Sequence, residues 1–177
     1  RHEWQGYKTP RPFSSENTAN IQKGIAYDTG VVGNWENILK EYTNSKQPFS
    51  GHTLLELGPG PDLGVGSLLL TKGAREYTAF DVQNLLPLTP DAFYRELDKT
   101  LEKIVDEKQH KKIQVEQEKG LRGEQSRLMH AHDINFDLDK LPAKKYTLVA
   151  SQAAFEHFID TEKTIEQITR VTADKAI

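Results

Sequence analysis

The sequence contains no cysteine among its 177 residues. This absence excludes disulfide bonds, cysteine-ligated zinc and thiol nucleophiles, and it agrees with a reducing compartment. Apolar runs are short as well, and none approaches the roughly 20 residues of a membrane-spanning helix. The first residues do not have the shape of a signal peptide, so we expect a cytoplasmic protein that does not enter a membrane.

An excess of positive charge is also missing. The formal net charge is −3, which gives no electrostatic reason to expect binding to nucleic acid or to an anionic membrane. Hydrophobic residues make up 36% of the chain and charged residues 28%. This composition is typical of a soluble globular protein, and the length allows one domain with a substantial core.

One stretch, from residue 52 to residue 81, shows a clear order of elements. Residues 53–57 form a short apolar run that predicts a strand, and residues 58–61 (GPGP) cannot continue it. A helical apolar pattern then ends at Gly73, and residues 76–80 regain strand propensity before Asp81. A glycine turn before a helix lets a ligand approach the backbone, and an acidic strand tip suits ribose hydroxyls. The order therefore indicates a nucleoside-cofactor site.

The rest of the chain continues the alternation of helices and strands. We expect helices over residues 20–28, 35–42, 91–119 and 161–171, strands over residues 126–132 and 146–150, and the approach to a further strand over residues 173–177. Gly30 and Gly33 are expected to separate the first two helices. This alternation predicts an α/β fold, with a mostly parallel, doubly wound sheet and helices on both faces.

Ligands of such sheets bind outside the carboxyl ends of the strands, where the strand order reverses. The residues expected at those ends are 56–60, Asp81, Asp133 and 151–157. Because the carboxyl ends of parallel strands meet at one edge, the sequence predicts that these residues form one site.

These residues resemble the class I S-adenosylmethionine-dependent methyltransferase family. The resemblance rests on Glu56-Leu57-Gly58-Pro59-Gly60, Asp81, Asp133-Ile134 and residues 151–158, and it covers about residues 50–177. It implies a Rossmann-like fold with S-adenosyl-L-methionine as the cofactor. The family's sheet usually continues with a fifth strand, another helix and an antiparallel hairpin, so the resemblance implies that the last strands of the family fold are missing here.

The resemblance also implies roles around the methionine part of the cofactor. Glu56 matches the acidic residue that helps to hold the methionine amino group, and Gly58-Pro59-Gly60 matches the turn that passes close to the cofactor. Ser151 and Gln152 match the end of the fourth strand, beside the methyl group. A carboxylate paired with a backbone or lysine group is the alternative role for Glu56.

Further matches concern the nucleoside part. Asp81 matches the residue that accepts hydrogen bonds from both ribose hydroxyls, with Val82 beside the adenine. Asp133 matches the residue that binds the adenine amino group, with Ile134 against the ring. The alternative for Asp133 is a role as a turn or cap residue.

The expected organisation has two parts. Residues 1–50 would form an N-terminal arm and helices that cover the cofactor cleft, and residues 51–177 would form the S-adenosylmethionine-binding domain. A charged helical insertion is expected at about residues 90–123. Its narrow apolar stripe is typical of a solvated covering helix, and a substrate lid or partner surface is the alternative.

The expected function is methyl transfer from S-adenosyl-L-methionine to a small-molecule acceptor. His157 is the candidate general base, because histidine titrates near neutral pH, and bracing of the last helix is its alternative role. His130 and His132 lack a further ligand cluster, so we expect no metal site. The acceptor and the oligomeric state are not predicted.

Two other functions fit parts of the pattern. One is a non-catalytic cofactor-binding or interaction domain of the same fold. The other is an NAD(P)-dependent oxidoreductase, which also uses a glycine turn and an acidic strand tip. Its G-x-G-x-x-G pattern is not met, because Leu63 stands at the third glycine position, and Glu56 would be unusual in that preceding strand.

Overall fold

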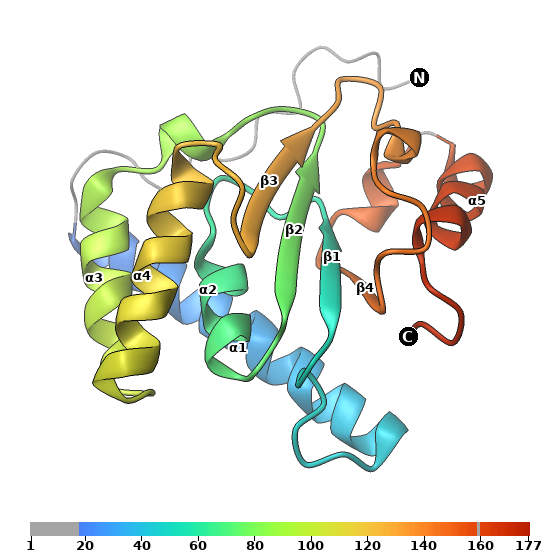
Figure 1. Cartoon of the computed structure of the whole chain (residues 1–177). Coiled ribbons are helices and arrows are strands. Elements are labelled where there is room, and N and C mark those ends of the chain that lie inside the picture. The colour runs from blue at the N-terminus through green and yellow to red at the C-terminus, as the bar shows by residue number, and fades with distance from the viewer. Residues whose placement is uncertain (1–17, 159) are drawn as a thin grey trace.

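The computed structural model of the chain describes residues 18–158 and 160–177. The predicted N-terminal arm thus lies largely outside the described residues. Four strands form one sheet in the order β3-β2-β1-β4 (Figure 1). They are β1 (Thr53–Leu57), β2 (Glu76–Asp81), β3 (Leu128–His132) and β4 (Leu148–Ser151). All three pairings are parallel, which confirms the predicted fold class.

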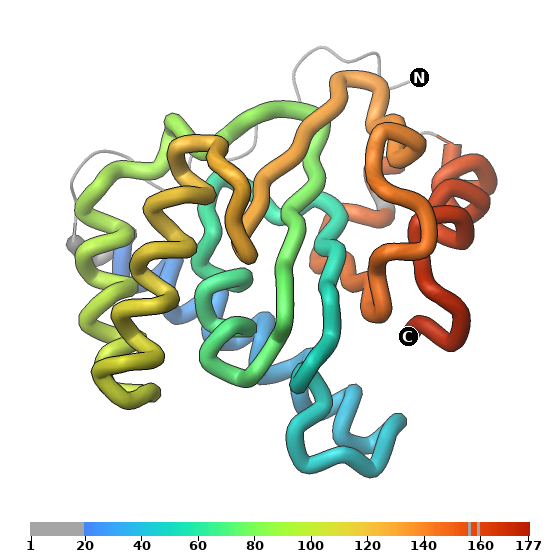
Figure 2. The backbone as a smooth tube through the Cα atoms, viewed as in Figure 1, coloured from blue at the N-terminus to red at the C-terminus, as the bar shows by residue number. Residues whose placement is uncertain are grey.

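Side-chain alternation along the strands creates two apolar layers. Leu54 of β1 packs with residues of the four helices α1 (Thr18–Thr43), α2 (Gly64–Thr71), α3 (Asp91–Leu101) and α4 (Glu107–Leu121). Leu55 and Leu57 enter the opposite layer, with Val171 of α5 (Thr161–Val171). Since successive side chains of a strand point to opposite faces, helices cover both faces of the sheet, as predicted. The backbone tube in Figure 2 shows α5 on its own beside β4.

The first helix differs from the prediction. α1 is a single helix of 26 residues, so the expected break at Gly30 and Gly33 is wrong. A glycine in a helix interior costs about 1 kcal/mol, and burial of Ile25, Val32 and Trp35 in the core offsets that cost. Ile38 and Tyr42 lie at helical spacing with Trp35 and Leu39, which favours packing against the domain, but they are 63% and 75% exposed.

The charged segment after β2 is a pair of helices, whereas one long helix was predicted. α3 ends at Leu101, and Asp106 starts α4 by accepting a hydrogen bond of 2.8 Å from the backbone N–H of Gln109. Asp98 joins the two helices, because it is 2.7 Å from Nε2 of His110 and accepts a bond from Gln114. The helices lie side by side in Figures 1 and 2.

Contacts near the ends of this pair explain two further differences. A threonine just before a helix is a common cap, but the hydroxyl of Thr89 donates to the carbonyl of Pro61 over 2.6 Å, and Pro90 takes the cap position of α3. A glycine often ends a helix, but Gly120 lies inside α4, where a Cβ would be 2.3 Å from the carbonyl oxygen of Leu128. A larger residue there would push α4 away from β3.

The C-terminal part follows the prediction closely. Asp160 caps α5 by accepting a 3.0 Å hydrogen bond from the N–H of Lys163. Helical spacing with Ile168 and Val171 favours an inward Ile165, but Ile165 is 51% exposed, whereas Val171 is fully buried. Ile177 then pairs with β4, donating to the carbonyl of Thr147 over 3.1 Å and accepting from Val149 over 2.9 Å. Residues 173–177 therefore do approach a further strand position, beside β4.

The topology determines where a ligand would bind. β1 pairs with β2 on one side and with β4 on the other, so the strand order reverses at the β1–β4 pair. In open α/β sheets this reversal opens a crevice at the carboxyl ends of the strands. No helix among the described residues is both long and apolar enough to cross a membrane.

Gly66 of α2 provides a test of the packing between α2 and the sheet. A Cβ at Gly66 would lie 2.3 Å from Cδ1 of Tyr77, a fully buried residue. We expect Gly66→Ala to lower the free energy of unfolding by about 1–3 kcal/mol, the usual cost of overpacking. Chemical denaturation followed by circular dichroism measures this change.

Gly30→Ala is the matched control, because a Cβ at Gly30 of α1 would have no described atom within 4 Å. The control should raise stability by up to about 1 kcal/mol through helix propensity. Equal effects of the two substitutions would contradict the close contact between Gly66 and Tyr77.

Candidate functional site

The glycine turn after β1 lies between β2 and the loop that follows β4. Gly58 has a φ of 72°, and its N–H donates to the carbonyl of Phe80 over 2.9 Å. A Cβ on Gly58 would be 2.3 Å from Cβ of Ala154, so only glycine allows this contact. Gly60, beyond Pro59, has a φ of 82°, and a Cβ there would have no described atom within 4 Å. Its outer side is therefore open to a ligand.

Asp81 connects this turn to the end of β2. Its Oδ1 accepts a 2.6 Å hydrogen bond from the N–H of Val82, and the N–H groups of Gly60 and Gln83 also donate to the carboxylate. Burial raises the pKa of Asp81, while these bonds and the nearby His132 oppose the increase. A carboxylate has about four acceptor sites, so after these three bonds Asp81 retains capacity for about one more, as from a ribose hydroxyl.

Glu56 is buried beneath the turn, on the face of β1 that α1 and α2 cover. The hydroxyl of Tyr77 donates to Oε2 of Glu56 over 2.5 Å. Burial raises the pKa of Glu56 to about 8, the charges of Asp62 and Asp81 raise it further, and the bond from Tyr77 opposes the shift. Glu56 therefore changes charge close to neutral pH.

A second pair of buried carboxyls lies next to Glu56, and the sequence analysis did not identify it. Asp62 accepts a 2.7 Å hydrogen bond from the N–H of Gly64 at the start of α2. Asp28 of α1 is only 5% exposed, and its carboxyl lies close to that of Asp62, beside Gly64. Burial and the neighbouring carboxylates raise the pKa of Asp28 to about 10, and burial raises that of Asp62 to about 6.

A hydrogen bond between the two aspartates would require a proton. Two ionised carboxylates have no donor between them, and the buried Oδ2 of Asp28 has no hydrogen-bond partner among the described residues. Both Oδ2 of Asp28 and Oδ1 of Asp62 lie within 3 Å of the position that a Cβ on Gly64 would take. The contact is satisfied when Asp28 is protonated and donates to Asp62.

A signal for Asp28 was present in the sequence. Ile21, Ile25, Val32 and Trp35 recur at helical spacing, and Asp28 continues the same stripe. A lone acidic residue inside an apolar stripe is buried when the stripe is buried, so it needs a partner. The expected break at Gly30 obscured this pattern.

The end of β3 contains Asp133 and Ile134. The N–H of Asp133 donates to the carbonyl of Asp81 over 3.0 Å, which joins this end to that of β2. Oδ1 of Asp133 accepts from the N–H groups of Asn135 and Asp137, and Oδ2 pairs with Lys140. The lysine lowers the pKa of Asp133. Asp133 is thus engaged as a turn residue, and an adenine amino group would have to share these oxygens.

Ile134 points away from the protein interior, with 60% of its surface exposed. It is therefore available to pack against a flat ring above the strand ends. The adenine-binding roles of Asp133 and Ile134 remain predictions.

The end of β4 lies beside the glycine turn. The hydroxyl of Ser151 donates to the carbonyl of Leu57 over 3.1 Å. Gln152 follows and is half-buried, and Ala153 has a φ of 53°, an uncommon conformation for a residue with a side chain. Such strained residues are found at ligand sites more often than elsewhere.

His157 is exposed and lies in a short 3-10 helix, η3 (Phe155–His157). Its N–H donates to the carbonyl of Ala154, the residue that contacts Gly58. Ala154 therefore connects the backbone of His157, the candidate base, to the glycine turn.

Hydrogen bonds and direct contacts therefore link all four strand ends at one edge of the sheet. The residues predicted from the sequence lie on these ends, and Asp28 and Asp62 extend the site toward α1. Within residues 18–158 and 160–177, no cluster of three or more histidine, cysteine or acidic residues is arranged to hold a metal ion.

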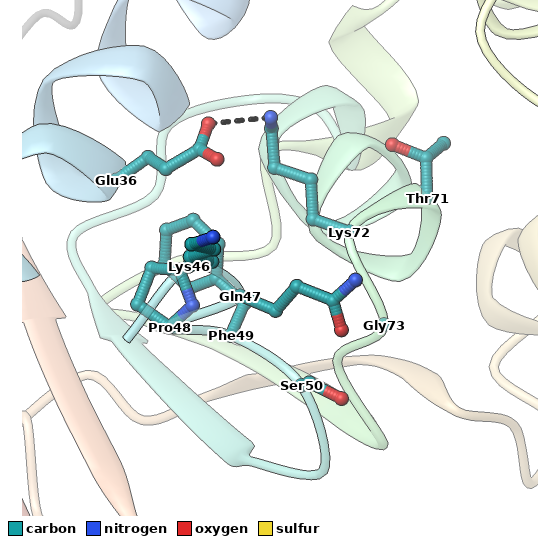
Figure 3. Close-up of a pocket in the computed structure, with 9 residues that line it drawn as sticks. All are labelled: Glu36, Lys46, Gln47, Pro48, Phe49, Ser50, Thr71, Lys72 and Gly73. Atoms are coloured by element: carbon teal, nitrogen blue, oxygen red, sulfur yellow. Dashed lines mark hydrogen bonds and ion pairs between the residues drawn. The ribbon is translucent and has the colours of Figure 1, made fainter. Parts of the chain in front are cut away.

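Two cavities lie away from Glu56 and Asp81. One, of about 290 Å³, lies between the turn before β1 and the end of α2, where Lys72 pairs with Glu36 over 2.5 Å (Figure 3). It is at the opposite, amino-end edge of the sheet from the glycine turn. The other, of about 400 Å³, runs along the outer side of β4 and includes Ser151 and Ile177.

Comparison with known proteins connects this fold to one class of enzymes. No protein-family model and no curated protein matches the chain. Among solved structures, a candidate S-adenosyl-L-methionine-dependent methyltransferase from Methanococcus maripaludis aligns with 93% of this chain, at 13% identity and a TM-score of 0.50. The chain spans 65% of that protein's length. The two proteins share the fold, a Rossmann-like sheet of the methyltransferase type.

Two further structures align with a smaller share of the chain and at a lower TM-score. An S-adenosylmethionine-dependent methyltransferase from Mesorhizobium loti aligns with 71% of this chain and 43% of its own, at 16% identity and a TM-score of 0.40. The YcgJ protein from Bacillus subtilis aligns with 70% of this chain and 41% of its own, at 18% identity and a TM-score of 0.41.

The buried aspartate pair should affect how stability depends on pH. When folding raises the pKa of a carboxyl, the folded state binds a proton that the unfolded chain has already released. Stability is therefore greatest below the ordinary pKa of 3.8 and is lost as the pH rises toward the folded value of about 10 for Asp28. Asp28→Asn keeps a donor for Asp62 but cannot ionise.

We expect Asp28→Asn to raise the free energy of unfolding by about 2 kcal/mol near pH 8, since each unit of pKa shift corresponds to about 1.4 kcal/mol. The free energy of unfolding should also decrease less steeply with pH in this variant than in the wild type. Urea denaturation between about pH 6 and 9 measures both effects. A variant that is less stable than the wild type across this range would contradict the protonated pair.

Proposed function

We propose that these residues bind S-adenosyl-L-methionine and that the protein transfers its methyl group to a small-molecule acceptor. One observation supports this most directly. Glu56, the turn 58–60 and Asp81 meet at the point where the strand order reverses, with the outer side of Gly60 open. This is where a doubly wound sheet binds its ligand.

The residues present fit a nucleoside with a positively charged amino-acid part. Asp81 can still accept about one further hydrogen bond, from a ribose hydroxyl, and Ile134 offers an exposed apolar surface for a ring. Asp62 provides negative potential beneath the turn, which favours a ligand ammonium group, and such a group would also favour ionisation of Glu56. Ser151 and Gln152 extend from the adjacent strand end toward the same part of the ligand.

The start of α2 argues against a dinucleotide. A pyrophosphate would need free N–H groups at the N-terminus of this helix. Asp62 already accepts the N–H of Gly64 there, and its negative charge at neutral pH would repel a phosphate. This geometry favours S-adenosyl-L-methionine over NAD(P) in the proposed site.

Methyl transfer would depend mainly on alignment. The cofactor supplies an activated methyl group on a sulfonium, and the departing thioether is neutral. The protein then has to hold the acceptor in line and exclude water. His157 would accept a proton from the acceptor where the acceptor must lose one.

Calorimetric titration with S-adenosyl-L-methionine tests the binding part of the proposal. Asp81→Ala removes the carboxylate that would bind the ribose, and we expect an affinity loss of about 1.5–3 kcal/mol, the scale for charge-assisted hydrogen bonds. The control is Asp174→Ala, because this exposed carboxylate pairs with Lys144 near the start of β4, away from the turn. No binding by a folded wild-type sample would refute the proposed cofactor, and equal affinities of the two variants would refute the role of Asp81.

A screen of small-molecule acceptors with radiolabelled cofactor tests the catalytic part. We expect methyl transfer to at least one acceptor, and His157→Gln should lower kcat by about 100-fold or more, as loss of a general base does. Cofactor binding without transfer to any acceptor class would instead indicate the non-catalytic binding domain. Transfer that is unchanged by His157→Gln would assign His157 to a structural role.

A further inference from the structure

Three carboxyls from three separate segments are buried together behind the glycine turn. Asp28 comes from α1, Glu56 from β1 and Asp62 from the end of the turn, and each is at most 9% exposed. Two tyrosine hydroxyls complete the surroundings: Tyr77 donates to Glu56, and Tyr94 of α3 lies near Asp62. The cluster thus connects three covering helices, α1, α2 and α3, to the central strand.

The charges that act on this cluster are all negative. Asp62 and Glu56 raise the pKa of Asp28, and Asp62 and Asp81 raise that of Glu56. Oδ2 of Asp28 is buried and has no hydrogen-bond partner among the described residues, and it lies close to Oδ1 of Asp62 beside Gly64. A buried cluster of this kind is neutralised either by protons or by a cation.

We propose that the Asp28–Asp62 pair shares one proton in the ligand-free protein, and that this cluster releases protons when a ligand with an ammonium group binds at the glycine turn. The inference rests on the proposed function, since S-adenosyl-L-methionine carries such a group. It assigns Asp28 as a residue that selects for ligand charge. Binding of the cationic group and loss of the proton are then linked, in the way that metal binding releases protons from its ligands.

The direction of the linkage follows from mass action. When binding releases a proton, a higher pH favours the complex, so the dissociation constant decreases as the pH rises. The groups that face Asp28 and Asp62 are Glu56, Tyr77, Tyr94 and, through Glu56, Asp81. Both tyrosines have pKa values above the ordinary one, because burial and the carboxylates oppose ionisation, so they stay neutral near pH 7.

Two related ligands distinguish recognition of the ammonium group from recognition of the nucleoside. S-adenosylhomocysteine has the ammonium group, whereas 5′-methylthioadenosine has the same nucleoside and thioether without the amino-acid part. For S-adenosylhomocysteine we expect the dissociation constant to fall up to about tenfold per pH unit between about pH 6.5 and 7.5. Proton release should also make the binding enthalpy measured by calorimetry depend on the ionisation enthalpy of the buffer. For 5′-methylthioadenosine we expect binding that does not change with pH.

Asp28→Asn tests the residue itself. The variant should reduce the pH slope for S-adenosylhomocysteine to half or less of the wild-type slope, whereas the exposed control Asp174→Asn should leave it unchanged. A structural role alone would change affinity but not this slope. Binding with equal slopes in the wild type and Asp28→Asn would overturn the inference while leaving the proposed function intact.

A measurement without ligand completes the test. Carbon NMR of the carboxyl groups should show Asp28 protonated and Asp62 ionised near pH 7 in the free protein. An ionised Asp28 would overturn the shared proton whatever the ligands do. If a folded sample binds neither ligand, the proposed function fails, and the coupling to an ammonium group fails with it.

Discussion

β1 is hydrogen-bonded on both edges, and its side chains alternate between two apolar layers. Leu55 and Leu57 take one layer, which forces Glu56 into the other, beneath α1 and α2. A buried charge costs several kcal/mol unless it is compensated, and here the compensation consists of a tyrosine hydroxyl and a proton. The rest of the site depends on this constraint. The chain leaves β1 after Leu57 through a glycine turn, so the buried carboxyl of Glu56 lies under a backbone segment that a ligand can approach closely.

The surroundings of the turn give the site its chemical character. Asp62 occupies the N-terminus of α2, Asp81 holds the turn to β2, and Asp28 reaches the same place from α1. A glycine turn before a helix usually attracts anions, but acidic side chains reverse that preference here. The edge of the sheet therefore suits a nucleoside with a positive charge more than a nucleotide, which is why the fold and the local electrostatics lead to the same proposed cofactor.

Much of the fold could be predicted from the sequence because its signals are local. The GPGP turn, the strand ending at Asp81 and the Asp160 cap of α5 each depend on residues close together in the chain, and all are present. The failures share a different cause. Gly30 and Gly33 do not break α1, because packing against the sheet outweighs helix propensity, and the insertion folds back at Asp106 because Asp98 can bind His110 across the turn. Neither contact can be derived from spacing alone.

By itself, the sequence determined the order of the four strands, the helical character of the segments between them and the residues at the ends of the strands, because side-chain periodicity and turn chemistry act over a few residues. Only the tertiary structure decided what those residues contact. It placed Asp28 against Asp62, engaged Asp133 with Lys140, and placed Ala154 against Gly58. Each of these contacts joins segments that meet only when the sheet closes, and the burial that changes the protonation of the carboxyls exists only after that packing has formed.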